Sequence, residues 1–262
     1  MKQAAFFSII YEDDAIIAVN KASGISVGGE RWEESAVRLD RLLASALSGG
    51  TENRERGDRE RVSGQAPKLY IVHRIDKETS GIVVFAKNTA AHKTLSAAFE
   101  SRSVEKTYTA VIHGRPAWPG GKVDCGLPLL PDGNKKHLTI IDKYRGKPSH
   151  TDFALLLSAG NYSVVEARPA TGRTHQIRIH LAALGHPIVC DPLYGKRDGD
   201  GVYLSSFKRN WRGDAFEEKP LLRRLGLHAL KLALPGYAAG LYLEAPLPRD
   251  MAALIRQMEK CG

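Results

Sequence analysis

Short apolar segments separated by turn residues recur along this chain, and they constrain its fold more than any other feature. Segments of this kind predict β-strands. The acidic residues 12–14 separate the first two segments, which predicts that these two strands form a hairpin. The predicted strands are Phe6–Tyr11, Ala15–Asn20, Leu69–His73, Gly81–Ala86, Glu105–His113, Leu138–Asp142, Thr151–Leu157, Asn161–Ala167, Leu227–Leu234 and Leu241–Glu244.

Helical periodicity is confined to a few segments between these strands. We expect Thr89 to cap the second helix and Gly185 to end the third. Because strands and helices do not alternate regularly, the order favours an α+β fold with a largely antiparallel mixed sheet, flanked by helices and loops. The predicted helices are Ser35–Leu47, Thr89–Phe99, Thr174–Leu184 and Arg249–Lys260.

A charged insert interrupts the chain at about residues 48–67. Residues 51–61 carry four acids and four arginines with almost nothing apolar. Such a segment cannot bury enough surface to offset its ordering entropy, so we expect an exposed, disordered loop. Hydrophobic residues make up 43% of the 262-residue chain, and no linker separates two self-sufficient halves. We therefore expect a single domain over residues 1–262, with the insert inside it.

Composition narrows the partners and the compartment. Three cysteines without paired spacing argue against a disulfide framework or a zinc ribbon. The sequence shows neither a signal peptide nor an apolar run of roughly 18 residues, so we expect a soluble cytoplasmic protein with no membrane segment. A net charge of +9 at pH 7 favours an anionic partner, with nucleic acid first and a membrane surface second.

The densest group of reactive side chains lies in His73–Gly81, with the sequence HRIDKETSG. Its acid, bases and hydroxyls gather where a predicted strand ends, a place where side chains can converge on a substrate. The alternative is a polar turn in which Asp76 or Thr79 bonds the local backbone.

A second group spans residues 170–187. The wider segment 167–190 contains three arginines, three histidines and no acid. At the start of a helix, free backbone N–H groups and the helix dipole add to this positive field, which favours a phosphate-rich ligand. A solvated basic helix face is the alternative.

The histidines of this second group also raise the question of a metal site. His175, His180 and His186 are spaced by five and six residues. This spacing differs from the i, i+4 pair of a zincin helix, no Glu stands between them, and nothing requires Asp191 as a fourth ligand. We therefore expect no metal.

Four segments carry a resemblance to a known family. The segments His73–Gly81 and Gly172–Gly195, the latter with the sequence GRTHQIRIHLAALGHPIVCDPLYG, resemble the RluA-type family of RNA pseudouridine synthases. Val19–Gly24 and Glu105–Tyr108 resemble two further motifs of that family. All four occur in the family's order. The resemblance implies the pseudouridine synthase catalytic fold and an isomerase that acts on structured RNA, either tRNA or ribosomal RNA.

The resemblance also implies roles for individual residues. Asp76 matches the family's catalytic aspartate, and Arg178 matches the arginine that pairs with it. Tyr108 matches a tyrosine that stacks on the target uracil, with a second role as a base left open. Arg74 matches an arginine that fills the space of the flipped base, and Ile177 an apolar wall. The predicted substrate-binding residues are Arg74, His73, Thr79, Arg173, His175 and Ile177.

The chemistry of the reaction agrees with the residues present. Converting uridine to pseudouridine involves no redox change and no transfer to another molecule, so we expect no cofactor, in keeping with the lack of a dinucleotide, Walker or zinc motif. The reaction needs an ionised carboxylate, and a nearby arginine favours and orients one. Whether Asp76 attacks the sugar, attacks the base or removes a ribose proton stays open.

Departures from the family pattern shape the expected RNA contacts. Cys190 stands where glycine is commoner, which we attribute to a small buried position, and Ala22 replaces a common proline. No room remains for the N-terminal S4 domain of many relatives, so we expect the catalytic domain to grip RNA. Two basic stretches are candidates: residues 133–148, net +4, and residues 206–224, net +3 with Phe207 and Trp211 interleaved. A solvated surface is the alternative for each.

Two other function classes compete with the isomerase. A non-catalytic RNA-binding protein could retain this fold, but binding alone would not need Asp76, Tyr108 and Arg178 together. A hydrolase using Asp76 with His73 or His175 would lack an activated nucleophile and a metal-ligand set. The sequence therefore favours an RNA pseudouridine synthase, which we expect to be a monomer.

Overall fold

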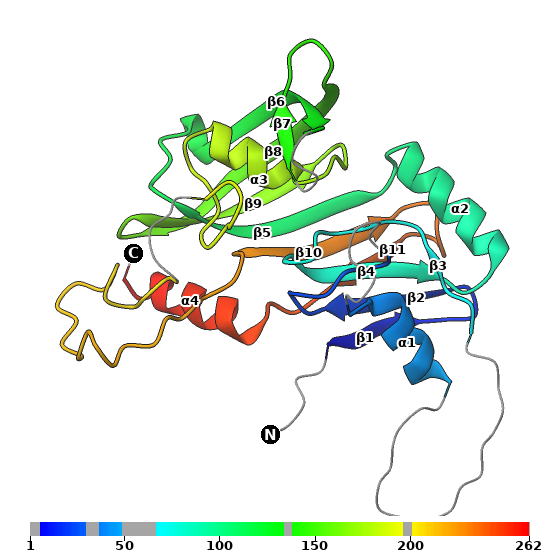
Figure 1. Ribbon diagram of the computed structural model, residues 1–262, viewed down its shortest axis with the longest axis horizontal. Coiled ribbons are helices and arrows are strands. Elements are labelled where there is room, and N and C mark those ends of the chain that lie inside the picture. The colour runs from blue at the N-terminus through cyan, green and yellow to red at the C-terminus, as the bar shows by residue number, and fades with distance from the viewer. Residues whose placement is uncertain (1–5, 30–36, 49–66, 134–137, 196–200, 262) are drawn as a thin grey trace, which may run out of the picture.

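The computed structural model describes residues 6–29, 37–48, 67–133, 138–195 and 201–261, and these form one twisted sheet with helices packed against it (Figure 1). The strands are β1 (Phe7–Glu12), β2 (Ile16–Lys21), β3 (Tyr70–Ile71), β4 (Ser80–Ala86), β5 (Glu105–His113), β6 (Lys122–Pro131), β7 (Thr139–Ile141), β8 (Lys147–Ala159), β9 (Tyr162–Pro169), β10 (Leu227–Leu234) and β11 (Leu241–Glu244). The helices are α1 (Leu39–Leu47), α2 (Thr89–Glu100), α3 (Gln176–Ala183) and α4 (Arg249–Glu259), with a short 3-10 turn at Pro119–Gly121.

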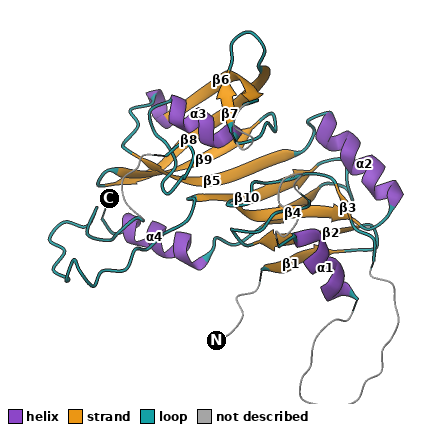
Figure 2. Cartoon of the chain, viewed as in Figure 1, coloured by secondary structure: helices purple, strands orange, loops and turns teal. Residues whose placement is uncertain are grey.

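The sheet has the order β1-β2-β4-β10-β5-β9-β8-β6-β7, with β3 added to β4 and β11 added to β10. Strands β4 and β10 run parallel at its centre, and the other pairings between these strands are antiparallel. Figure 2 shows that the chain is mostly strand and loop, with helices at the faces and ends of the sheet. The predicted α+β class and the predicted hairpin of β1 and β2 are both confirmed.

Some element boundaries differ from the prediction for local reasons. Helix α1 begins at Leu39 because Arg38 is extended and forms a bridge with Ser26. The cap of α2 is Asn88, whose side chain accepts the Ala91 N–H, and not Thr89. Strand β6 was not predicted; its Gly and Pro residues are typical of a turn, yet it pairs along its length with β8.

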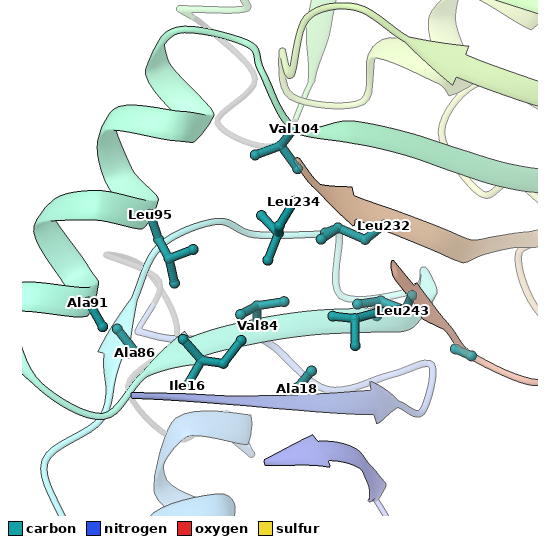
Figure 3. Close-up of a cluster of buried hydrophobic side chains, with 12 residues drawn as sticks. Ile16, Ala18, Val84, Ala86, Ala91, Leu95, Val104, Leu232, Leu234 and Leu243 are labelled. Carbon is teal, nitrogen blue, oxygen red and sulfur yellow. The ribbon is translucent and has the colours of Figure 1, made fainter. Parts of the chain in front are cut away.

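Two helices cover opposite faces of the sheet beside β4. Successive strand residues point to opposite sides. Val84 therefore belongs to the cluster under α2, together with Leu95, as Figure 3 shows. Val83 and Phe85 belong to the cluster that contains Leu39 of α1. Strand β4 is thus buried on both faces. A buried strand is a rigid support for the turn that precedes it, residues 76–79. The charged insert falls almost entirely in residues 49–66, outside the described residues.

A glycine at the start of β4 sets how closely the central strands approach. Gly81 has φ +117°, and a Cβ there would lie 2.2 Å from the Ala229 carbonyl oxygen on β10. Only glycine fits this position without moving the strand. The close approach of β4 and β10 therefore explains why the HRIDKETSG motif ends in glycine. None of the helices in the described part of the chain is both long and apolar enough to cross a membrane.

Candidate active site

Asp76 sits in a tight turn between β3 and β4. The Thr79 N–H donates to the Asp76 carbonyl oxygen at 3.1 Å, which closes the turn. The segment after β2 holds the turn from outside: the Gly24 N–H donates to the Lys77 carbonyl at 2.8 Å, and the Ser23 hydroxyl donates to the Glu78 carbonyl. The Asp76 side chain is 21% exposed, so a ligand can reach its carboxylate. Two of the four resembling segments thus meet at Asp76.

Lys21 is a buried amine behind this turn. Its Nζ donates to the carbonyl oxygens of Ala22, Ile25 and Lys77 at 2.9, 2.9 and 3.0 Å. Burial lowers the pKa of Lys21 to about 7, against the attraction of the nearby carboxylates of Glu78 and Asp76. Lys21 therefore anchors the backbone of the turn.

Arg178 of α3 joins two carboxylates. Its Nη1 donates to Asp76 Oδ2 at 3.3 Å, while Nε and Nη2 donate to the two oxygens of Asp191 at 2.8 Å each. Burial alone would lower the pKa of Arg178, but hydrogen bonds and charge from Asp191 and Asp76 raise it. Burial would likewise raise the pKa of Asp191, and the bonds from Arg178 lower it. Arg178 and Asp191 therefore stabilise each other's charged forms, and the same guanidinium also contacts the Asp76 side chain.

Tyr108 and Ile177 supply the apolar side of the site. Tyr108 lies on β5, in register with Ala229 of β10 and Ala167 of β9. It packs against the buried cluster that contains Ile177, the residue next to Arg178. Burial, and then the Asp76 charge, raise the pKa of Tyr108 above its usual value. Its phenol therefore stays neutral near pH 7, which suits an aromatic surface.

The fold therefore gathers a part-exposed carboxylate, a buried arginine and a neutral tyrosine at one place. Comparison with known proteins shows which family has this sequence pattern. The model of the family described as RNA pseudouridylate synthase matches residues 15–183. The chain belongs to this family.

Individual relatives agree with this assignment. The chain is 32% identical to Ribosomal large subunit pseudouridine synthase D of Zymomonas mobilis, over 95% of this chain and 72% of that protein. It is 33% identical to the synthase D of Neisseria meningitidis serogroup B, over 94% of this chain and 60% of that protein. The chain thus spans 60 to 72% of the length of these two curated relatives.

A solved structure agrees as well. Human RNA Pseudouridylate Synthase Domain Containing 1 is 27% identical, with a TM-score of 0.65, over 95% of this chain and 87% of that one. These findings confirm the predicted family, the fold class and the enzyme class, an isomerase that acts on RNA. They do not favour the non-catalytic alternative.

One of the predicted substrate-binding residues, His73, has its own packing partners. His73 Nε2 accepts the Val84 N–H at 2.9 Å, and its ring stacks on Phe99 with centroids 4.6 Å apart. Burial and the Lys106 charge lower the pKa of His73 to about 3, so the ring stays neutral. The geometry gives His73 a packing role and does not bring it to Asp76.

The other predicted residues lie around the same turn and the start of α3. The Thr79 side chain is 1% exposed, and its hydroxyl has no hydrogen-bond partner among the described residues. Arg74 is exposed, while Arg173 Nε donates to the Pro148 carbonyl at 3.3 Å. His175 has a left-handed backbone, with φ 55°, and its Nδ1 lies 2.9 Å from the Tyr194 hydroxyl.

The three histidines weighed as metal ligands point to separate partners. His180 lies between the hydroxyls of Ser149 and Thr151 at 2.9 and 3.0 Å, and His186 Nδ1 lies 3.0 Å from the His113 carbonyl oxygen. In the described part of the chain, no group of three or more His, Cys, Asp or Glu could hold a metal ion.

Two expectations from the sequence need correction. Phe207, expected to interleave with basic residues on an RNA-binding surface, is 7% exposed and packs edge-on against Tyr162. Phe216, in the same stretch, is fully exposed instead. Cys190 is half-buried with φ 56°, so the glycine common in the family is explained by a left-handed backbone and not by burial.

Asp191 and Tyr194 are the site residues that sequence reasoning missed. Asp191 was weighed only as a metal ligand, although it lies inside the resembling segment and follows the acid-free stretch of 167–190. The signal available was the first carboxylate after a stretch with three arginines, three histidines and no acid, because any of these cations that is buried needs a counter-charge.

Proposed function

We propose that this chain isomerises uridines of ribosomal RNA to pseudouridine, with Asp76 as the essential carboxylate. The observation that carries the proposal is the 3.3 Å contact between Arg178 and Asp76 beside Tyr108, in a member of the RNA pseudouridylate synthase family. Ribosomal RNA is preferred to tRNA because the similar bacterial proteins are named ribosomal large subunit synthases.

The reaction balances without a cofactor. The N1–C1′ bond of uridine breaks, the uracil rotates, and a C5–C1′ bond forms. The hydrogen on C5 leaves as a proton and N1 gains one, so no oxidant, reductant or second substrate is consumed. Asp76 acts as the nucleophile or the general base, and Arg178 orients its carboxylate.

The side chains around Asp76 suit an extruded uracil. Taking a base out of its stack costs a few kcal/mol. Stacking on the neutral ring of Tyr108 would return about 1–3 kcal/mol of this cost. Ile177 would provide an apolar wall, and the exposed Arg74 would occupy the space that the base leaves. Arg173, His175 and Thr79 would contact the flanking RNA or shape the pocket.

Exposed basic and aromatic side chains support RNA binding by this domain. In the turn between β7 and β8, Tyr144 is 99% exposed and is flanked by exposed Lys143 and Arg145. The second basic stretch carries the fully exposed Phe216. Basic side chains would hold phosphates and the aromatic rings would stack on unpaired bases. Residues 134–137 of the first stretch lie outside the described residues.

The proposal extends to the domain organisation, the oligomeric state and the cellular compartment of the protein. We propose a single catalytic domain over residues 1–262 that acts as a monomer in the cytoplasm. Cys125, Cys190 and Cys261 are all free thiols, in keeping with a reducing compartment.

Tritium release tests the function and the substrate together. Purified protein is incubated with ribosomal RNA and, separately, tRNA, each carrying [5-³H]uridine. We expect release from ribosomal RNA only. Release from tRNA only would overturn the substrate choice. Salt-sensitive binding without release from either pool would support the non-catalytic alternative.

A further inference from the structure

We propose that Asp191 is a positioning residue of this isomerase, which holds the Arg178 guanidinium in the orientation that presents Nη1 to Asp76. The inference rests on the proposed function and deepens it. Asp191 does not contact Asp76, so its effect would pass through Arg178.

Asp191 fixes the orientation of the Arg178 guanidinium through two hydrogen bonds. Asp191 accepts from Nε and Nη2, both at 2.8 Å, which fixes the plane of the guanidinium along one edge. The adjacent Nη1 is left for Asp76, at 3.3 Å. The Arg178 and Asp191 side chains are 1% and 0% exposed, whereas Asp76 is 21% exposed. The buried pair is therefore the fixed part of the site, and the reactive carboxylate is the accessible part.

Asp191 is itself held by its own backbone turn. Its Oδ1 also accepts the N–H groups of Leu193 and Tyr194 at 2.9 and 3.1 Å. The Gly195 N–H donates to the Asp191 carbonyl at 3.1 Å, and a Cβ on Gly195 would lie 2.4 Å from that oxygen. The carboxylate therefore has little freedom to follow Arg178; the arginine must follow the carboxylate.

Tyr194 supports the guanidinium from its face. The Arg178 Cζ lies 5.2 Å from the centre of the Tyr194 ring, a cation–π distance. The Tyr194 hydroxyl accepts the Thr139 N–H of β7 at 2.9 Å and lies 2.9 Å from His175 Nδ1. One turn, residues 191–195, thus fixes both the edge and the face of the guanidinium.

Charge explains why this support matters. Without Asp191, a buried arginine would keep one longer contact to a part-exposed carboxylate. A buried charge that loses its main partner reorients toward others or toward water. We expect Arg178 then to leave the position in which it orients Asp76.

The test is Asp191→Asn, which removes the charge and keeps the shape. With ribosomal RNA as the substrate, we expect kcat to fall at least tenfold while KM and the Kd for RNA change less than twofold. Asp191→Glu keeps the charge but displaces it by one methylene, so its kcat should lie between those of the wild type and Asp191→Asn. If Asp191→Asn does not fold, the fall of kcat in Asp191→Glu at unchanged RNA affinity decides the question.

Asp250→Asn is the matched control. Asp250 accepts Nε and Nη2 of Arg224 at 2.7 Å each, in the same two-bond geometry, but the third contacts of Arg224 are to Ser80 and Leu225 instead of Asp76. We expect it to lower Tm and to leave kcat within twofold. An unchanged kcat in folded Asp191→Asn, or an equal fall in the control, would overturn the positioning role. A wild type that releases no tritium would overturn the proposed function instead.

Discussion

Two arginine–aspartate pairs in this molecule share a geometry and differ in their surroundings. Arg178 binds both oxygens of Asp191 through Nε and Nη2, and Arg224 binds both oxygens of Asp250 in the same way. The first pair is almost fully buried and has a third partner, Asp76. The second pair is 21% and 36% exposed and joins the segment before β10 to helix α4.

The comparison shows that the two-bond geometry of an arginine–aspartate pair does not by itself indicate a function. The remaining Nη1 of Arg224 donates to the Ser80 hydroxyl and to the Leu225 carbonyl at 3.3 Å, both neutral groups. The same atom of Arg178 meets an accessible carboxylate. We propose that charge at the third contact separates an arginine that orients a reactive carboxylate from a structural arginine.

Removing each arginine should give the largest contrast. Arg178→Met leaves Asp191 buried without its cation, so we expect a loss of about 3–5 kcal/mol in the free energy of unfolding. Arg224→Met leaves a part-exposed carboxylate, and we expect a loss of about 1–2 kcal/mol. Urea unfolding measures both. Tritium release should vanish only with Arg178→Met, and equal effects of the two variants would break the comparison.

Each region also contains a buried histidine that should make stability depend on pH. Burial, followed by charge from His150, lowers the pKa of His180 from 6.5 to about 4, and burial lowers that of His228 from 6.5 to about 4. The unfolded chain therefore binds more protons between these values, so stability is full above pH 6.5 and falls as the pH drops toward 4. The loss is about 3 kcal/mol for each histidine.

Urea unfolding between pH 4 and 7 checks this expectation. His180→Gln and His228→Gln should each make the dependence on pH less steep, although each also removes a hydrogen bond. An unchanged slope in both variants would contradict the neutral, buried state of these rings.

The smallest expected effect comes from Cys190, next to Asp191. A left-handed residue costs about 1–2 kcal/mol, and glycine avoids that cost while losing about 0.5–1 kcal/mol more backbone entropy on folding. We therefore expect Cys190→Gly to raise the free energy of unfolding by about 0.5 kcal/mol, with kcat unchanged. Destabilisation measured by thermal unfolding would show that the thiol's packing outweighs backbone strain.

Sequence patterns predicted the fold where local signals agree with the sheet. Strand β5 was predicted with its observed bounds, and β4 within one residue. Strand β4 is a continuous apolar run, and β5 is rich in β-branched and aromatic residues, both of which are typical of strands. Strand β6 was missed because Gly126, Pro128 and Pro131 are typical of turns, while pairing with β8 and β7 overrides that preference.

The site was predictable to the extent that its motifs are contiguous. The HRIDKETSG motif and the resembling segment around Arg178 led to Asp76 and Arg178, and the structure places their side chains 3.3 Å apart. Nothing local indicates that His73 turns toward Phe99. The acid-free stretch before Asp191 indicates that a cation needs this carboxylate, but only the packing of α3 shows that the cation is Arg178.

Asp76→Asn tests the central claim most directly. The substitution removes the charge and keeps the size of the side chain at a part-exposed position, so the protein should fold and bind RNA as the wild type does. Tritium release from ribosomal RNA carrying [5-³H]uridine should fall below detection, while the wild type releases tritium. Near-normal release by folded Asp76→Asn would contradict the assignment of Asp76 as the essential carboxylate.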